Sequence, residues 1–531
     1  MGSKKKHQKG KARSGSASKA GASSHGCGAA KPRAGAAEQT IRQNTTCNEL
    51  MAAIEGPAPV VDMGGRTIEL IKERLTICGR NKTIANCTIK CRASHVYCEP
   101  RGGDAAENIC FRNVTFEGDG TGIPANMPQP SKEVVSEDGM VVVAGARGVS
   151  FEHCTFRHAK APVDPRGRAL AAGLNVFETT VRIDDCRFLN NMGPGLAATG
   201  STTVLVVNDS EIRGNLLSGI NATNGACIDV AGSQLSDNGL DGILAADSDV
   251  RATETVCSGN RHCGAAVAVT GGGAGGKLVL DRCRMDGNAV AAIMACREGA
   301  RVAATDVECV MGENRHRCRG ELIAGVQCVD GARCTIRGGR IAGFHVGLSA
   351  RDASSIVASN VDCSGGQFGI MAGAGATVRL ERATLRRNVC CGIAADSGAT
   401  VSAGDCEMHL NGEGVGAHGR GQVRLERCSV SGGCFAGVVA DGAGTRIDLE
   451  DVEITRYVKS GIEVRDGAQV AMRGGSMTRN KGPGCSAEGR GTVVTLAGVE
   501  CARNGGANVE VRGGASLTVD GAAIRPESGG G

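Results

Sequence analysis

Apolar side chains in this chain come in short runs that alternate with polar positions and end at glycine, asparagine or aspartate. The clearest marker of the pattern is a glycine followed by an aliphatic or small residue, which returns every 22 to 24 residues in the regular repeats. It is found at Gly195-Leu196, Gly219-Ile220, Gly242-Ile243, Gly264-Ala265, Gly347-Leu348, Gly369-Ile370, Gly392-Ile393, Gly414-Val415, Gly437-Val438, Gly461-Ile462 and Gly484-Cys485. A fixed period of this length predicts a solenoid, whose repeats bury their apolar faces by stacking on one another.

Residues 388–411 illustrate a single repeat. They contain three short runs, Gly392–Ala395, Thr400–Ala403 and Cys406–Met408, separated by turn-forming residues. No run has the length or the i, i+3, i+4 spacing of a helix, so each is predicted to be a short strand between tight turns. The chain is therefore predicted to be all-β, a right-handed parallel β-helix solenoid of about 18 coils with three short strands per coil. At about 4.8 Å per coil the rod would be roughly 80–90 Å long.

The third strand of each repeat shows which side chains point inward. The same phrase recurs as Asn86-Cys87-Thr88-Ile89, Asn113-Val114-Thr115-Phe116, His153-Cys154-Thr155-Phe156 and Asp185-Cys186-Arg187-Phe188. Because residues two apart in a strand share a face, cysteine and the following apolar residue are predicted inside, with Thr or Arg outside.

An asparagine stands shortly before the glycine of many repeats. Asparagine tolerates left-handed backbone geometry and its amide can bond to neighbouring groups, so these residues are predicted to form a stacked turn ladder. They are Asn191, Asn215, Asn238, Asn260, Asn288, Asn388, Asn411, Asn480 and Asn504.

The ends of the chain differ from the repeats. Residues 1–39 are rich in Gly, Ser, Ala and Lys and are predicted to be a disordered basic tail. Residues 40–58 carry a capping-box spacing, Thr46 to Glu49, followed by Leu50, Met51 and Ile54, and are predicted to hold a short helix that caps the first coil. The β-helix is predicted over 59–525, and 526–531 as a flexible C-terminus without an obvious cap.

Composition narrows the class of protein. The chain has 82 glycines and 2% aromatic residues, which suits a narrow coil with many turns. No apolar run approaches 18 residues, so no transmembrane segment is expected. Many of the 26 cysteines fall at inward positions, and the basic N-terminus lacks the apolar stretch of a secretory signal. We therefore expect reduced thiols and an intracellular protein, cytoplasmic or nuclear.

The Asn-Cys-Thr-Ile/Phe phrase, the turn asparagine and the Gly-Ile step together resemble the right-handed parallel β-helix repeat family of the pectin-lyase-like fold. The resemblance runs from about Val60 to Ile524. That family includes polysaccharide lyases, hydrolases and epimerases as well as non-enzymatic members, so the resemblance implies the fold and leaves the activity open. The signatures of polygalacturonases are missing, and Asp164-Pro165-Arg166 lacks the histidine of the alginate-epimerase Asp-Pro-His step.

No residue is assigned as catalytic or metal-binding from the sequence, and no cofactor is expected. An acidic turn column follows the glycine-bearing strands and could bind calcium, but turn chemistry explains it better. Its members are Asp247, Asp330, Asp352, Asp396, Asp441 and Asp466. His153 and His158 near the 160–171 loop are a weaker hypothesis for proton transfer. Asp184 and Asp185 are adjacent in one strand and are predicted to point to opposite faces. Cys78, Cys87, Cys91, Cys98 and Cys110 have only a permissive spacing for zinc.

Two basic segments are candidates for partner binding. Arg315, His316, Arg317 and Arg319 form a basic cluster in a mid-rod insertion, which is predicted to be a solvated loop, with contact to an acidic partner or a phosphate as the functional alternative. Lys4, Lys5, Lys6, Lys9 and Lys11 of the tail could contact an anionic partner.

These features favour an intracellular, non-enzymatic scaffold or interaction rod with protein partners. The alternative is a carbohydrate-active protein that binds a saccharide in a groove along the β-helix; if an enzyme, it would be a polysaccharide lyase or glycoside hydrolase. The absence of Trp and the presence of only two Tyr argue against a sugar groove lined by aromatic faces.

Overall fold

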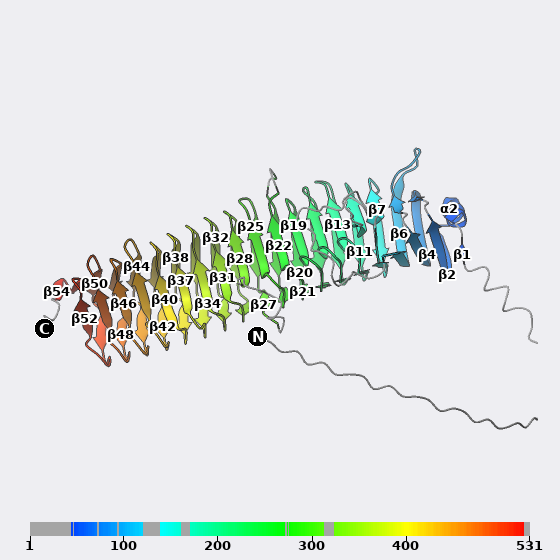
Figure 1. Ribbon diagram of the computed structural model, residues 1–531. Helices are drawn as coiled ribbons and strands as arrows, with labels where there is room; N and C mark the ends of the chain where they lie inside the picture. The colour runs from blue at the N-terminus through cyan, green and yellow to red at the C-terminus, as the bar shows by residue number, and fades with distance from the viewer. Residues whose placement is uncertain are drawn as a thin grey trace, which may run out of the picture. The chain divides into compact units, whose positions relative to one another are not determined.

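The computed structural model describes residues 44–45, 47–71, 74–92, 95–120, 139–160, 170–270, 273, 275–312 and 323–524. These residues belong to one compact unit that begins at Asn44. The predicted tail 1–39 and C-terminus 526–531 lie outside them. The unit is a parallel β-solenoid of about 18 turns, as predicted (Figure 1).

One sheet, sheet B, takes one strand from every coil, and all its described pairings are parallel. Its strands are β3 (Leu75–Ile77), β5 (Val96–Cys98), β7 (Gly139–Ala144), β10 (Ala172–Phe177), β13 (Leu196–Thr199), β16 (Ile220–Thr223), β19 (Ile243–Ala246), β22 (Cys263–Ala268), β25 (Ala291–Cys296), β28 (Ala324–Val329), β31 (Val346–Ala350), β34 (Phe368–Ala372), β37 (Cys391–Ala395), β40 (Glu413–Ala417), β43 (Val438–Asp441), β46 (Ile462–Arg465), β49 (Cys485–Glu488) and β52 (Val509–Arg512).

The other sheet, sheet A, has 36 strands within the described residues and takes two strands from most coils. The first row is β2 (Val60–Ile71), β4 (Gly79–Arg92), β6 (Ala106–Gly118), β8 (Val149–Glu152), β11 (Thr180–Asp184), β14 (Val204–Asn208), β17 (Cys227–Ala231), β20 (Asp249–Thr253), β23 (Lys277–Asp281), β26 (Arg301–Thr305), β29 (Arg333–Arg337), β32 (Ser355–Ser359), β35 (Thr377–Glu381), β38 (Thr400–Gly404), β41 (Gln422–Glu426), β44 (Arg446–Glu450), β47 (Gln469–Arg473), β50 (Val493–Ala497) and β53 (Ser516–Val519). The second row is β9 (Thr155–Arg157), β12 (Arg187–Leu189), β15 (Glu211–Arg213), β18 (Gln234–Ser236), β21 (Val256–Ser258), β24 (Arg284–Asp286), β27 (Glu308–Val310), β30 (Arg340–Ala342), β33 (Asp362–Ser364), β36 (Thr384–Arg386), β39 (Glu407–His409), β42 (Ser429–Ser431), β45 (Glu453–Thr455), β48 (Ser476–Thr478) and β51 (Glu500–Ala502).

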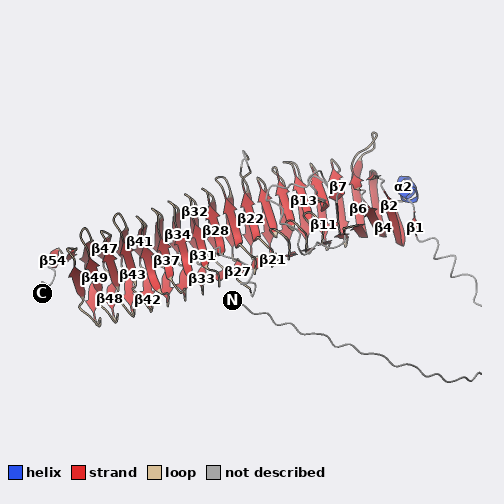
Figure 2. Cartoon of the chain, in the orientation of Figure 1, coloured by secondary structure: helices blue, strands red, loops and turns tan. Residues whose placement is uncertain are grey.

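The ends of the stack are closed in two different ways. At the N-terminal end, α2 (Cys47–Glu55) buries Leu50 and Ile54 in the core, and β1 (Asn44–Thr45) pairs with β2 (Figure 2). At the C-terminal end, β54 (Ala522–Ile524) turns back antiparallel on β53. This hairpin occupies the edge for which the sequence indicated no cap, and it stops parallel stacking there.

The interior is lined by the side chains that alternate inward along each strand. In the N-terminal coils five phenylalanines stack from coil to coil, with ring centroids 4.5 Å apart for Phe156 and Phe188. Farther along, aliphatic, methionine and cysteine side chains replace the rings. The cysteines predicted inside at 154, 186, 283, 309, 406 and 428 are all buried reduced thiols. They pack as small hydrophobic groups.

The asparagines at the turn after the second row of sheet A form hydrogen-bonded runs. The side-chain amide of Asn215 donates to Oδ1 of Asn238 at 3.0 Å, and the backbone amide of Asn215 donates to the same oxygen at 3.1 Å. Equivalent bonds join Asn191 through Asn288, Asn388 to Asn411, and Asn480 to Asn504. These bonds satisfy buried polar groups and hold successive coils in register.

The helix α2 has nine residues. No helix in the described residues has the length and apolar character needed to cross a lipid bilayer.

Candidate functional site

The outward face of sheet B carries a column with one side chain per coil at the start of each strand. The strand register aligns Cys263, Ala291, Ala324, Val346, Phe368, Cys391 and Glu413 in that order. Asp241, two residues before Ile243, continues the column one coil earlier, because Ile243 pairs with Ala265. None of these side chains belongs to the main core. The column therefore presents a thiol beside a carboxylate at two separate places.

At the first place, a carboxylate, an imidazole and a thiol converge. Asp241 and His262 are joined by a 2.6 Å hydrogen bond between Oδ1 and Nδ1. The same oxygen accepts the backbone amide of Cys263 at 2.9 Å. One ligand atom from each of the three residues lies within 4.8 Å of the other two. The Asp241 side chain is 5% exposed and that of His262 17%, so the pair is largely shielded from solvent.

The thiol of this cluster faces a methionine from the next coil. Sγ of Cys263 lies 3.7 Å from Sδ of Met294. Ala266 and Ala291 are small and buried, and they leave room for the methionine to reach back over them. Leu244 and Val290, both partly buried, complete the apolar cover. The result is a small apolar patch outside the main core with two sulfur atoms at its centre.

On its N-terminal side the same face is polar. The hydroxyls of Thr199 in β13 and Thr223 in β16 are hydrogen-bonded at 2.8 Å. Asn221 is in β16, two residues before Thr223, and it pairs with Leu244 of β19. Its Oδ1 is buried, and within the described residues no donor bonds to it. A buried amide oxygen without a donor has a strong tendency to accept a hydrogen bond from a ligand.

At the second place in the column, the thiol of Cys391 donates to Oε2 of Glu413 at 3.4 Å. A Cβ at Gly416 would lie 3.1 Å from that oxygen, 3.3 Å from Nε2 of His418 and 3.6 Å from Sγ of Cys391. The bare glycine therefore leaves a hollow between three reactive side chains. Burial first, then the Glu413 charge and hydrogen bond, raise the pKa of the Cys391 thiol.

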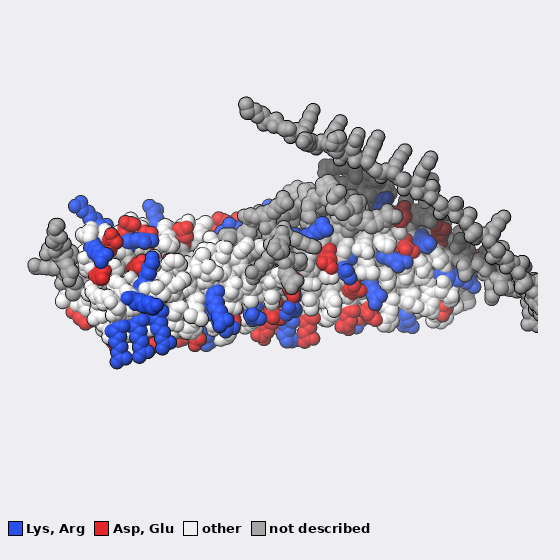
Figure 3. Space-filling view, turned by 60° about the horizontal axis from the view of Figure 1, so that its bottom comes forward, with Lys and Arg blue, Asp and Glu red and all other residues white. Residues whose placement is uncertain are grey.

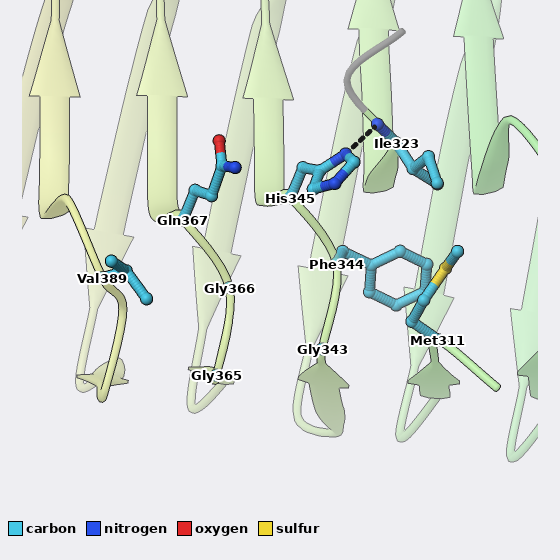
Figure 4. A pocket seen from close by; sticks show the side chains of 9 residues that line it. All are labelled: Met311, Ile323, Gly343, Phe344, His345, Gly365, Gly366, Gln367 and Val389. Carbon is cyan, nitrogen blue, oxygen red and sulfur yellow. Dashed lines mark hydrogen bonds between the residues drawn. The ribbon is translucent and has the colours of Figure 1, made fainter. Parts of the chain in front are cut away.

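A cavity of about 260 Å³ opens farther along the rod, between the two clusters. It is lined by Met311, Ile323, Gly343, Phe344, His345, Gly365, Gly366, Gln367 and Val389, and Figure 4 shows Phe344 facing Met311. It lies where Gly312, Phe344 and Gly366 replace the ladder asparagine. Nδ1 of His345 accepts the backbone amide of Ile323 at 3.2 Å, so this imidazole nitrogen is already used. The volume is below the ~300–1,000 Å³ of most small-molecule sites.

The predicted partner-binding residues are not placed by this structure. Arg315, His316, Arg317 and Arg319, the tail lysines, and most of the 118–138 and 160–171 loops lie outside the described residues. The interpretation of the basic cluster and of the tail stays a prediction.

The other residues singled out in the sequence do not come together into one site in the described part of the chain. His153 bonds through Nδ1 to Oδ2 of Asp185 at 2.8 Å, and both side chains are largely exposed. Asp184 instead accepts from Arg182 and Asn208, so the two adjacent aspartates have separate partners. Both carboxylates lie on the outside of the coil, Asp185 exposed and Asp184 half-buried, so the prediction that they point to opposite faces was wrong. Within the described residues, neither the acidic turn column nor the N-terminal cysteines assemble three ligand atoms.

Charged side chains cover much of the rest of the surface, and acids and bases intermix over most of it (Figure 3). On sheet A many arginines pair with acids across coils, for example Arg427 with Asp405 at 2.7 Å. Basic side chains gather at the C-terminal end of the solenoid, on the left of Figure 3. Arg456, Arg479 and Arg503, one coil apart and all exposed, follow aligned strands there.

The convergence of Asp241, His262, Cys263 and Met294 was missed by the sequence reasoning. A signal was available, since Asp241 and Cys263 each directly precede the glycine that marks the repeat. Residues at that position one repeat apart must be neighbours once the coils stack. The contribution of Met294 had no such signal, because its reach depends on the small side chains beside it.

The comparisons with known proteins agree with this architecture. Residues 139–307 and 316–430, more than half of the chain, match the family described as "Right handed beta helix region". The chain belongs to the right-handed β-helix family. Among curated proteins, none matches it.

Several solved structures are similar in fold. A variant of the periplasmic alginate epimerase AlgG is 12% identical with a TM-score of 0.37, over 71% of this chain and 87% of the epimerase. The surface protein and adhesin PfbA of Streptococcus pneumoniae is 10% identical with a TM-score of 0.28, over 89% and 94% of the two chains. The catalytic domain of a GH87 α-1,3-glucanase is 10% identical with a TM-score of 0.22, over 74% and 60%.

These findings correct the predicted intracellular scaffold. The similar structures are described as an alginate epimerase, a surface protein and adhesin, and a glucanase, and none of these three is described as an intracellular scaffold. The scaffold prediction relied on the small number of Trp and Tyr residues, but hydroxyl and amide groups can also bind a sugar, so that count does not exclude a saccharide ligand. The fold is shown by the strand topology and the family match, and the function has to be argued from the side chains of this chain.

Proposed function

We propose that this β-helix protein binds a saccharide along the outward face of sheet B, beside β13, β16 and β19. The observation that carries the proposal is the buried Oδ1 of Asn221, which has no donor among the described residues. A sugar hydroxyl is a donor and an acceptor on a small rigid ring, and it can supply the missing hydrogen bond.

The surroundings support a polyhydroxylated ligand. The paired hydroxyls of Thr199 and Thr223 stand on the strands before and at Asn221, and they can both donate and accept. Ala197, which pairs with Asn221 on the neighbouring strand and is only 4% exposed, keeps the face flat beside that amide. Polar groups at fixed positions on a rigid sheet bind with little loss of conformational entropy.

The test is binding of an array of neutral and acidic oligosaccharides, followed by calorimetric titration of the ligands that bind. Asn221→Leu is expected to weaken binding about tenfold, the effect of losing a hydrogen bond worth ~1.4 kcal/mol. Gln234→Ala, an exposed amide on sheet A, is the matched control and should bind as the unaltered protein does. Absence of binding to any saccharide, or equal affinity in Asn221→Leu, contradicts the proposal.

A chemical change of the bound saccharide has a candidate group on the same face. The Asp241 carboxylate orients the His262 imidazole through Nδ1, which leaves Nε2 to take up or release a proton. If the protein cleaves or epimerises its ligand, Asp241→Asn should lower turnover while saccharide binding is retained. Equal loss of binding and turnover would assign Asp241 to binding instead.

A further inference from the structure

We propose that Cys263, Met294 and His262 form a Cu(I) site on the outward face of sheet B, with Asp241 as the residue that positions the imidazole. The inference goes beyond saccharide binding and does not depend on it. It rests on two contacts of the Cys263 thiol: Sδ of Met294, from the next coil, lies 3.7 Å away, and a ring nitrogen of His262 lies within 4.8 Å.

The spacing of the two sulfur atoms fits a single metal ion. Two sulfur ligands at about 2.3 Å from a metal, at a tetrahedral angle, lie about 3.8 Å from each other. The observed distance between Sγ of Cys263 and Sδ of Met294 is 3.7 Å. The strand register accounts for this approach, because Ala291 pairs with Cys263 and Met294 follows three residues later.

The imidazole is held as a metal-binding histidine is usually held. Nδ1 of His262 donates to the buried carboxylate of Asp241, and among the described residues nothing bonds to Nε2. A carboxylate on one nitrogen fixes the ring orientation and makes the other nitrogen a better ligand. The carboxylate also holds the Cys263 backbone amide, so one side chain positions two of the ligands.

The donor set and its surroundings select copper in its reduced state. Thiolate and thioether sulfur are soft ligands that favour Cu(I), whereas structural zinc sites use Cys, His and carboxylate ligands without thioethers. A thiolate and a Cu(I) ion together carry no net charge, which suits the apolar cover of Leu244, Val290 and Ala266. Binding replaces the thiol proton of Cys263, and that proton leaves to solvent.

Copper and proton transfer exclude each other at this site. An Nε2 that is bound to Cu(I) has no lone pair for a proton. Cu(I) loading should therefore suppress any turnover that depends on His262 and leave saccharide binding at Asn221 unchanged.

The experiment is an anaerobic titration of the full-length reduced protein with Cu(I) against the coloured chelator bathocuproine disulfonate. We expect one tightly held copper that Cys263→Ser loses. Met294→Leu, which keeps the volume and the Asp241–His262 pair, should weaken it at least about tenfold. X-ray absorption should count two sulfur neighbours in the unaltered protein and one in Met294→Leu.

The controls come from the same face. Cys391→Ser removes a thiol of the same column, and Met371→Leu removes a methionine of the same outward row as Met294; both should keep the copper. Retention of the copper in Cys263→Ser, or an unchanged sulfur count in Met294→Leu, overturns the proposal. Displacement of the copper by Zn(II) overturns the assignment to Cu(I). Saccharide titration of Met294→Leu reports separately on the proposed function.

Discussion

Two thiols on the outward column of sheet B stand in opposite chemical environments. Cys263 faces a methionine sulfur under an apolar cover, beside an oriented imidazole. Cys391, in the same column farther along the rod, donates to a carboxylate in a hollow floored by glycine. The strand register is the same at both places, so the difference is to be sought in the neighbouring side chains.

The strand register shows which side chains at the second place differ from those around Cys263. When the two places are aligned on their thiols, each residue of the first cluster has an equivalent at the second place. Asp241 is equivalent to Phe368, and His262 is equivalent to Cys390. Ala291 is equivalent to Glu413, and Met294 is equivalent to Gly416. Glu413 therefore sits where the first place has a small residue, and it holds the Cys391 proton. Glu413 accepts the thiol proton of Cys391 and keeps that thiol protonated. The Asp241 oxygen instead bonds to His262 and to the Cys263 backbone amide, and the Cys263 thiol faces a second sulfur, an arrangement that suits a soft metal.

The largest expected effect is the creation of a site. Phe368→Asp, Cys390→His, Glu413→Ala and Gly416→Met together reproduce the first cluster at the second place. Gly416 does not have a positive φ, and the nearest atom to its added Cβ is the Glu413 carboxylate, which the substitution removes. The fourfold variant should hold two coppers in the chelator titration, against one in the unaltered protein. A single copper would show that the backbone at the second place cannot present these ligands.

The asparagine ladder differs between the coils of the two clusters in the number of hydrogen bonds that each asparagine accepts. Asn260 accepts two hydrogen bonds from Asn238, at 3.1 and 3.0 Å, because the run is continuous there. Asn388 is the first asparagine after the coils in which other residues take the ladder position. It accepts a single hydrogen bond, from the backbone amide of Gly366. Asn260→Ala should lower the free energy of unfolding by about 3 kcal/mol, and Asn388→Ala by about 1 kcal/mol less. Urea unfolding of both variants measures the difference, and equal losses would mean that the ladder bonds contribute little.

A smaller effect is expected from the residue that positions the imidazole. Asp241→Asn keeps the shape of the side chain but removes the charge that orients His262, so Cu(I) affinity should fall about tenfold. Asp405→Asn, an exposed carboxylate paired with Arg427 on sheet A, is the control and should leave the affinity unchanged. If Asp241→Asn binds copper as tightly as the unaltered protein, the carboxylate has no positioning role.

The smallest effect is a change in thiol reactivity at the second place. The pKa of Cys391 is raised by burial and further by Glu413, so Glu413→Gln should lower that pKa and increase the thiolate fraction at pH 8. Alkylation of Cys391 by iodoacetamide, followed by mass spectrometry, should become roughly two- to fivefold faster. Cys309, whose pKa burial raises to about 12, serves as the internal reference because Glu413 does not act on it.

Much of the fold could be predicted because its signals are local. Tight turns need glycine or asparagine at set positions, and strands alternate with a period of two, so the repeat and its inward residues are visible within about two dozen residues. The inward cysteines and the N-terminal helix followed from the same patterns. The C-terminal hairpin of β53 and β54 did not, because an antiparallel return is not encoded by the repeat.

The period, the number of coils and the inner columns follow from the amino-acid sequence alone, since each depends on residues that are close in the chain. Only the tertiary structure decided which outward side chains meet. Asp241, Cys263 and Met294 come from three successive coils with insertions of different length between them, and their contact depends on strand register and on the small residues that let a long side chain reach back. Chemistry on the outer face of a solenoid is a property of the stacking, and no single repeat contains it.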